Sequence, residues 1–166
     1  MAAEAEHGHE HGDAARETAL VVLSAAGVAI ALYLSWVAVA GVDSIACGPA
    51  GDCHAVQTSE YSKVAGVPVA MLGLAMYLAL LAGAVARRLM GSAWHATRAI
   101  VVWTFALALG GTLYSAYLTY VELFVIDAIC AWCVASAIVV TAIFVLALPD
   151  VRRAASTGGR SPASDV

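Results

Sequence analysis

Four cysteines form two close pairs, and a close pair of thiols can exchange electrons by cycling between a dithiol and a disulfide. Cys130 and Cys133 make a Cys-x-x-Cys pair at the start of the apolar run Ile129–Leu148. If that run is a helix, the pair occupies its first turn, where free backbone N–H groups and the positive end of the helix dipole favour a thiolate. Cys47 and Cys53 lie far upstream, in a polar interruption between apolar segments. The two pairs together suggest a thiol relay.

The spacing of the upstream pair allows a small ring. Gly48, Pro49 and Gly51 lie between the two cysteines and favour a tight turn that could bring the sulfurs together. A disulfide that closes so short a ring adds little stability, and an accessible one favours exchange over permanence.

Three interpretations of the cysteines compete. The first is a pair of inert structural disulfides, which small secreted folds need but a membrane helix bundle does not. The second is a structural metal site made of all four cysteines. Four thiolates suit tetrahedral zinc, but zinc pairs favour two to four intervening residues and the upstream pair has five. The third is a redox relay, in which the Cys-x-x-Cys pair exchanges with the upstream pair, and it is the leading hypothesis.

The composition indicates a membrane protein. The chain of 166 residues is 62% hydrophobic and 12% charged, whereas a soluble domain is about half apolar and about one-quarter charged. The net charge is −4 and only eight residues are Lys or Arg. No basic face for nucleic acid is predicted, and membrane lipid is the expected surrounding.

Four uncharged runs of 20 to 23 residues match the length of about 20 that a helix needs to cross a bilayer. They predict an all-α membrane protein, a bundle of four transmembrane helices with an outward loop that bears a short interfacial helix within Ala55–Ala65. The expected division is a disordered cytoplasmic tail over residues 1–18, a four-helix membrane domain over 19–148 and a second cytoplasmic tail over 149–166. The four runs are Ala19–Gly41, Val64–Ala86, Ala99–Val121 and Ile129–Leu148.

The cationic side chains predict the orientation. Lys63 falls on one side of the predicted spans and seven arginines fall on the other, which the positive-inside rule makes cytoplasmic. Both termini are then cytoplasmic, and both cysteine pairs face the extracytoplasmic side of an inner or plasma membrane. In a bacterium-like cell this is the oxidising side. The arginines are Arg16, Arg87, Arg88, Arg98, Arg152, Arg153 and Arg160.

The acidic first tail contains His7, His9 and His11 at alternating positions. Imidazole is a common metal ligand, so a metal site is conceivable. A solvated tail is the favoured interpretation because no packed partner is evident.

Three tyrosines, Tyr114, Tyr117 and Tyr120, recur every third residue near the outer end of the third run. Such a face suits an aromatic belt at the membrane surface, or alternatively the wall of a pocket for a flat-ring cofactor. Glu122 and Asp127 then bracket the turn to the fourth run. Asp127 stands where a helix N-cap is expected, and its charge opposes thiolate formation nearby.

An electron relay embedded in lipid needs an acceptor in the lipid phase. A quinone meets this need because it is apolar, diffuses in the bilayer and takes the two electrons that one dithiol supplies. The expected cofactor is therefore a quinone, either menaquinone or ubiquinone.

Several features occur in a fixed order along the chain. The upstream cysteine pair is followed six residues later by Ser59, then by Gly66-Val-Pro68 at the start of the second run, and then by Cys130-Ala-Trp-Cys133 at the fourth. In this order they resemble the vitamin K epoxide reductase family, in its bacterial branch. The resemblance covers about Ala19–Leu148, essentially the whole predicted membrane part.

The resemblance implies a four-helix bundle around a quinone, with four catalytic cysteines. Electrons would pass from a thioredoxin-like or DsbA-like partner to Cys47 and Cys53, and then to the Cys-x-x-Cys pair and the quinone. It further implies that Cys133 faces the quinone ring, that Cys130 exchanges with the loop pair through Cys53, and that Cys47 meets the partner.

The candidate cofactor contacts are Ser59, which matches a serine that the family places near the active cysteines, together with Tyr117 and Tyr120. Vertebrate members have a tyrosine four residues after the motif, where this chain has Ala137. Quinone reduction rather than epoxide reduction is therefore predicted. Some bacterial members carry a fused thioredoxin-like domain, but this chain ends soon after the fourth run, so the partner is expected to be a separate chain.

The predicted function is a membrane thiol:quinone oxidoreductase that reoxidises a separate extracytoplasmic thioredoxin-fold oxidase and supports disulfide bond formation. The alternative is a membrane scaffold with a structural metal site of four cysteines. A DsbB-type quinone reductase shares the chemistry, but its Cys-x-x-Cys pair lies in the first outward loop, unlike the pair here.

Overall fold

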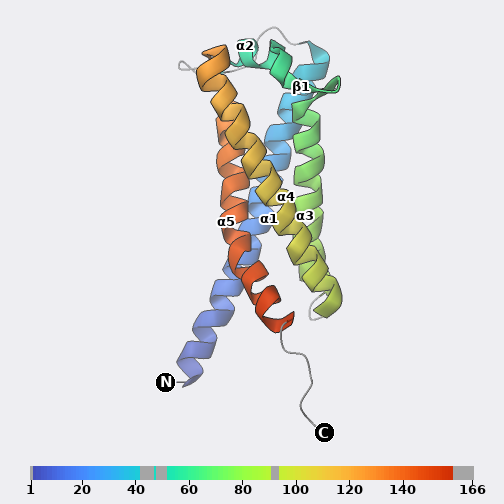
Figure 1. The fold of residues 1–166 in the computed structure, drawn as a ribbon. Coiled ribbons are helices and arrows are strands. Elements are labelled where there is room, and N and C mark those ends of the chain that lie inside the picture. The colour runs from blue at the N-terminus through green and yellow to red at the C-terminus, as the bar shows by residue number, and fades with distance from the viewer. Residues whose placement is uncertain (1, 42–46, 48–51, 91–93, 159–166) are drawn as a thin grey trace.

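The computed structural model describes residues 2–41, 47, 52–90 and 94–158. Within them, four long helices run lengthwise beside one another, and a small cap covers one end of the bundle (Figure 1). The first helix starts and the last one ends toward the opposite end. The long helices are α1 (Ala2–Ala40), α3 (Val69–Met90), α4 (Trp94–Val121) and α5 (Ala131–Gly158).

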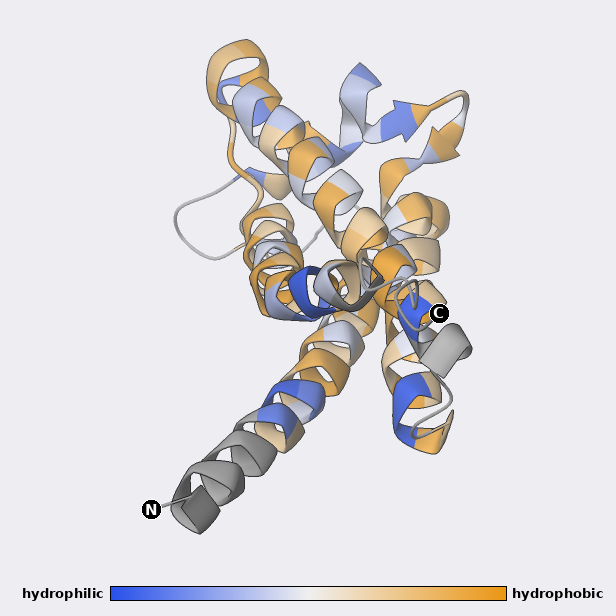
Figure 2. Cartoon of the chain, turned by 60° about the horizontal axis from the view of Figure 1, so that its bottom comes forward, coloured by the Kyte–Doolittle hydropathy of each residue, from blue (hydrophilic) through white to orange (hydrophobic). Residues whose placement is uncertain are grey.

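Each long helix, α4 together with the turn that follows it, contains a stretch that is long and apolar enough to cross a membrane. Hydrophobic residues cover the length of the helices, while hydrophilic ones gather near their ends and in the cap (Figure 2). The predicted bundle of four transmembrane helices is confirmed, and the chain is a multi-pass membrane protein. The four stretches are Asp13–Ala40, Val69–Met90, Arg98–Ile126 and Ala131–Ser156.

The first helix begins well before its membrane span. The sequence predicts a disordered tail over residues 1–18, whereas α1 begins at Ala2 and is continuous to Ala40. The segment is rich in Ala and Glu, which are strong helix formers. Asp13 and Arg16 also pair at 3.1 Å, one turn apart, which supports the helix ahead of the span.

The last helix continues past Leu148, although Pro149 removes one backbone donor. The next residue, Asp150, is buried and pairs with Arg16 at 2.6 Å and with Arg87 at 2.7 Å. These ion pairs hold the following turn against α1 and α3. The helix therefore persists to Gly158, and its ribbon changes direction near the end (Figure 1).

The cap begins with the short helix α2 (Cys53–Thr58). Its N-cap is Asp52, whose carboxylate accepts a hydrogen bond from the Ala55 N–H at 3.0 Å. The helix ends because Ser59 is extended, with φ −65° and ψ 158°. The short helix that the sequence predicts is therefore present, but it does not reach Ala65.

A 3-10 turn, η1 (Glu60–Ser62), leads from α2 into a small hairpin that the sequence does not predict. Strand β1 (Lys63–Val64) pairs antiparallel with β2 (Val67–Pro68). Ala65 and Gly66 between them have φ of 51° and 83°, which suits a two-residue hairpin turn. The hairpin delays the start of the second span to Val69, five residues after the predicted start at Val64.

Close helix contact in the middle of the bundle depends on small residues. A Cβ atom added to Gly111 would lie 2.6 Å from the sulfur of Met76, and one added to Gly27 would overlap the ring of Tyr77. By contrast, a Cβ added to Gly110 meets nothing within 4 Å. The apolar core at this level contains the buried residues Leu20, Ala31, Tyr77, Leu80, Ala84, Ala108, Val140 and Ile143.

At the end opposite the cap, acidic and basic side chains of α1, α3 and α5 form one network, here named the charged end. It is built around Asp150 and its two arginines, and Asp13 extends it by pairing with Arg153 at 3.1 Å. Arginines that the sequence places on one side of the membrane thus lie at one end of the bundle. The charged end comprises Asp13, Arg16, Glu17, Arg87, Asp150 and Arg153.

Candidate active site

The upstream cysteines form a disulfide in the cap. Cys47 and Cys53 are joined with their Cα atoms 5.8 Å apart. Cys53 is also the first residue of α2, so this helix fixes the position of its sulfur. Cys53 is buried, whereas Cys47 is partly exposed.

The Cys-x-x-Cys pair lies at the start of α5. The first helical bond runs from the Val134 N–H to the Cys130 carbonyl at 3.0 Å, so Cys130 occupies the N-cap position and Cys133 lies in the first turn. Both thiols are free. Asp127 does not cap this helix, contrary to expectation, because it ends the preceding turn in the left-handed conformation, with φ 55°.

The two pairs meet at the capped end of the bundle, here named the cysteine end. Cys53 and Cys130 are both buried in one small cluster, and Cys47 and Cys133 pack against it. Cys47 and Cys130 are 83 residues apart in the chain, so the fold rather than local sequence brings the pairs together. All four sulfur-bearing side chains therefore lie on the same side of the membrane-spanning region.

The two free thiols are unequal. A hydrogen bond from the Cys133 thiol lowers the pKa of Cys130 from its ordinary value of 9.0 to about 7. Burial and the negative charge of Glu122 act in the opposite direction. Cys130 is therefore the sulfur of the pair that carries the thiolate near neutral pH.

Glu122 is a buried acid beside both thiols, with 4% of its surface exposed. Its Oε2 accepts a hydrogen bond from the Cys130 N–H at 3.1 Å, and its carboxyl group also hydrogen-bonds to the Cys133 side chain. The residue is placed there by a π-helical turn, η2 (Glu122–Ile126), that extends α4. Such wide turns are rare and recur at functional sites.

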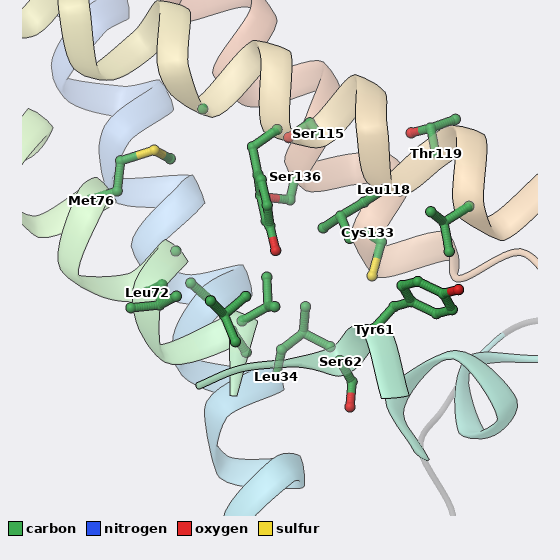
Figure 3. Close-up of a pocket in the computed structure, with 18 of the residues that line it drawn as sticks. Leu34, Tyr61, Ser62, Leu72, Met76, Ser115, Leu118, Thr119, Cys133 and Ser136 are labelled. Atoms are coloured by element: carbon green, nitrogen blue, oxygen red, sulfur yellow. The ribbon is translucent and has the colours of Figure 1, made fainter. Parts of the chain in front are cut away.

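A cavity of about 450 Å³ lies directly beneath the cap. All four long helices contribute walls to it, and α2, Ser59 and η1 form its roof. The Cys133 sulfur points into it and toward the ring of Tyr61 (Figure 3). The walls are mainly apolar, with a few hydroxyl groups from Ser115, Thr119 and Ser136. A cavity of this size and character suits a small, flat, mostly apolar molecule.

Comparison with known proteins identifies the family. The model of the vitamin K epoxide reductase family matches residues 18–148, which include the cap, all four cysteines and most of the four long helices. The chain belongs to the vitamin K epoxide reductase family. A search of curated proteins finds no match.

Membership in the vitamin K epoxide reductase family makes the chain a membrane thiol–disulfide oxidoreductase, and the proteins of this family are linked to quinones. The matched range agrees with the resemblance that runs from about Ala19 to Leu148. The assignment to the bacterial branch stays a prediction.

The cavity contains one of the three predicted cofactor contacts of this family member. Ser59 lines the cavity, and its hydroxyl donates a hydrogen bond to the Val56 carbonyl at 2.7 Å. Tyr117 and Tyr120 do not line it and are 49% and 59% exposed. Three residues advance a helix by about 300°, so the face drifts by about 60° at each step and only Tyr114 reaches the wall. The cavity thus gives no support to a quinone contact by Tyr117 or Tyr120.

Sequence analysis does not single out two other residues in the site. Glu122 is interpreted only as part of a turn, and a solitary acid at the end of an apolar run is the one signal that could have identified it. Tyr77 lines the cavity and donates its hydroxyl hydrogen to the Ser136 carbonyl at 2.8 Å. Nothing in the local sequence distinguishes Tyr77 from the other tyrosines.

Among the described residues, no group of three or more His, Cys, Asp or Glu side chains is arranged to hold a metal ion. The loop sulfurs are joined to each other, and a sulfur in a disulfide is not a thiolate ligand. The side chains of His7, His9 and His11 lie outside the described part of the structure, so the conceivable tail site is untested.

Proposed function

We propose that this member of the family is a thiol:quinone oxidoreductase that reoxidises a separate thioredoxin-fold protein and reduces a quinone, thereby supporting disulfide bond formation. The observation that carries the proposal is the cysteine cluster. It joins the loop pair to the Cys-x-x-Cys pair, and Cys133 faces an apolar cavity. A route for two electrons thus runs from the partly exposed Cys47 to the cavity.

The first exchange occurs at the loop pair. A thiolate of the reduced partner attacks the sulfur of Cys47, and Cys53 leaves as a thiolate. The second thiol of the partner then attacks the partner sulfur that is bonded to Cys47. The partner leaves with its own disulfide, and Cys47 is left reduced. The partial exposure of Cys47, against the burial of Cys53, supports this order of attack.

The second exchange joins the two pairs. The Cys53 thiolate attacks the sulfur of Cys130 in an oxidised Cys130–Cys133 disulfide, and Cys133 leaves as a thiolate. Cys47 then attacks Cys53, which restores the loop disulfide and frees Cys130. The shared burial of Cys53 and Cys130 supports this pairing. The observed disulfide in the loop and the free thiols at the start of α5 correspond to the state at the end of this exchange.

The final step oxidises the Cys-x-x-Cys pair. A quinone bound in the cavity supplies a two-electron acceptor, and Cys130 and Cys133 form a disulfide as their two electrons and two protons leave. The apolar walls and the thiol fit such a ring, and menaquinone and ubiquinone are both candidates.

The proposed orientation places the cysteine end outside the cytoplasm of a bacterium-like cell. The grouping of Arg16, Arg87 and Arg153 at the opposite end supports it through the positive-inside rule. In that orientation the loop pair faces an oxidising compartment, where a thioredoxin-fold oxidase works.

An anaerobic assay tests the proposal. Purified protein in detergent receives a reduced thioredoxin-fold oxidase and a quinone, and the absorbance of the quinone is followed. Wild-type protein should reduce the quinone, and Cys133→Ala should abolish this reduction while keeping the helical content and monodisperse behaviour of the wild type. Unchanged turnover in Cys133→Ala would refute the assignment. Stoichiometric bound zinc without thiol-dependent quinone reduction would favour the alternative of a membrane scaffold with a four-cysteine metal site.

A further inference from the structure

Glu122 has an unusual environment for a carboxyl group. It is buried at the cysteine end, where apolar residues surround it, and burying an acid without a cation is costly. The salt bridges of the described residues lie at the charged end and do not include Glu122. Its described partners are instead the Cys130 N–H, at 3.1 Å, and the Cys133 thiol. The fold thus places an acid against the two sulfurs that react.

The same side chain lies between two pockets. Glu122 lines the cavity into which Cys133 points, and it also lines a second pocket formed by residues of the cap and of the turn before α5. The second pocket includes the exposed acids Asp52 and Asp127. A proton on Glu122 is therefore within reach of the thiols, the cavity and the exposed surface of the cysteine end.

We infer that Glu122 is a catalytic residue that moves protons during oxidation of the Cys-x-x-Cys pair: its carboxylate accepts a proton from a thiol of this pair and delivers it to an oxygen of the quinone. The inference rests on the proposed function, because it names the proton carrier for that reaction.

The proton transfers balance. Counted from the fully protonated pair, the S–H bond of Cys130 breaks first and that of Cys133 second, one S–S bond forms between them, and two O–H bonds form on the quinone, which accepts both electrons. Glu122 takes up and releases one proton in each of two transfers and ends as it began. No oxidant beyond the quinone is needed.

The other nearby polar groups are less suited to this task. Asp52 caps α2 through the Ala55 N–H, and Asp127 is exposed at the end of η2. Tyr77 reaches the cavity, but its hydroxyl hydrogen is donated to Ser136. Among the acids that the structure describes, Glu122 is the one with hydrogen bonds to both residues of the Cys-x-x-Cys pair.

The test compares two reactions in one variant. Glu122→Gln keeps an oxygen that can accept the Cys130 N–H but cannot carry a proton as a carboxylate does. Quinone reduction by the pre-reduced protein should slow by at least about a hundredfold, the size expected for general acid–base catalysis. Stoichiometric oxidation of the reduced partner by the fully oxidised protein, without quinone, should keep the wild-type rate. The matched control is Glu17→Gln, the same substitution at the charged end, which should leave both rates unchanged.

Each outcome decides a different question. A wild-type rate of quinone reduction in Glu122→Gln overturns the inference and leaves the proposed function standing. Equal slowing of both reactions assigns Glu122 to holding the cysteine cluster together and also overturns the inference. Wild-type protein that exchanges thiols but reduces no quinone overturns the proposed function itself.

A second measurement tests the inference even if the Glu122→Gln variant does not fold. The single-turnover rate of quinone reduction by wild-type protein should fall in D2O, because proton transfer by Glu122 accompanies the step, while the quinone-free exchange with the partner should fall less. Glu122→Asp, which keeps the carboxyl group, should slow quinone reduction by less than the roughly hundredfold factor expected when that group is lost. Equal solvent effects on both reactions would overturn the inference.

Discussion

Two acids are buried at opposite ends of the same bundle, and their partners differ. Asp150 at the charged end is 7% exposed and lies against the guanidinium groups of Arg16 and Arg87, at 2.6 Å and 2.7 Å. Glu122 at the cysteine end is 4% exposed and lies against an amide and a thiol. A buried acid between two cations holds helices together through its ion pairs, whereas one beside thiols can exchange a proton with them. Similar burial therefore serves stability at one end and chemistry at the other.

The backbone shows the same contrast. All four described residues with clearly positive φ, Gly41, Ala65, Gly66 and Asp127, lie at the cysteine end, where the π-helical turn is also found. The charged end consists of continuous α-helix within the described residues. Uncommon backbone conformations cluster at functional sites because the chemistry, rather than the local sequence, sets the required geometry. Changes at the two ends should therefore have separable effects.

The largest expected effect on stability is at the charged end. Asp150→Ala removes the acid between two arginines and leaves their charges without this partner, which should lower the free energy of unfolding by about 3–5 kcal/mol. Thermal unfolding in detergent, followed by circular dichroism, measures the loss. Protein that remains folded should keep its quinone-reduction rate within about twofold, because Asp150 does not line the cavity.

Asp13→Ala is the matched control, because Asp13 pairs with Arg16 and Arg153 but is half exposed. It should cost no more than about 1 kcal/mol. If Asp150→Ala were as stable as Asp13→Ala, the ion pairs would not hold the charged end together, and the comparison of the two acids would fail.

A smaller effect is expected midway between the two ends. Gly111→Ala places a methyl group 2.6 Å from the Met76 sulfur and should destabilise the bundle by about 1–3 kcal/mol through overpacking. Gly110→Ala meets nothing within 4 Å and should change stability by less than about 1 kcal/mol. Thermal unfolding of the two variants side by side measures the difference. Equal stabilities would show that the helices can separate at this level at no cost.

The mildest test concerns the titration of Cys130 in protein with the loop disulfide intact. Because the pKa of Cys130 is about 7, the ultraviolet absorbance of its thiolate should fall about tenfold for each pH unit below 7 and level off above it. The groups that set this midpoint are the Cys133 thiol and the Glu122 carboxyl. Cys133→Ala removes the hydrogen bond that lowers the pKa, so the midpoint should rise toward 9, whereas Asp150→Ala should leave it unchanged. A midpoint near 9 in wild-type protein would contradict the inequality of the two thiols.

The membrane spans could be predicted from sequence because uncharged runs of sufficient length have few alternatives to a spanning helix. The residues at which the helices begin and end could not be predicted. Ion pairs between distant residues extend α5 past Pro149, and a hairpin delays the start of α3. Such contacts depend on the packed bundle and leave no periodic pattern in the chain.

The cysteine chemistry was predictable for the same kind of reason, since Cys-x-x-Cys is a local motif. The role of Glu122 could not be predicted from the sequence, because its contact with Cys130 depends on the π-helical turn between them. Tyr117 and Tyr120 are the reverse case, because the sequence singles them out as quinone contacts and neither lines the cavity. A spacing of three residues suggests one face, but the cumulative rotation of the helix turns the later tyrosines away from the cavity.

The short helix α2 has a consequence for energetics as well as for structure. Its first residue, Cys53, belongs to the loop disulfide, while Val56 on its next turn and the adjoining Ser59 form part of the roof over the cavity. A molecule that touches this roof and prefers one redox state of the loop must, by thermodynamic reciprocity, shift the midpoint potential of the Cys47–Cys53 couple. Binding of a molecule in the cavity and reduction of the loop disulfide are thus thermodynamically linked through one six-residue helix.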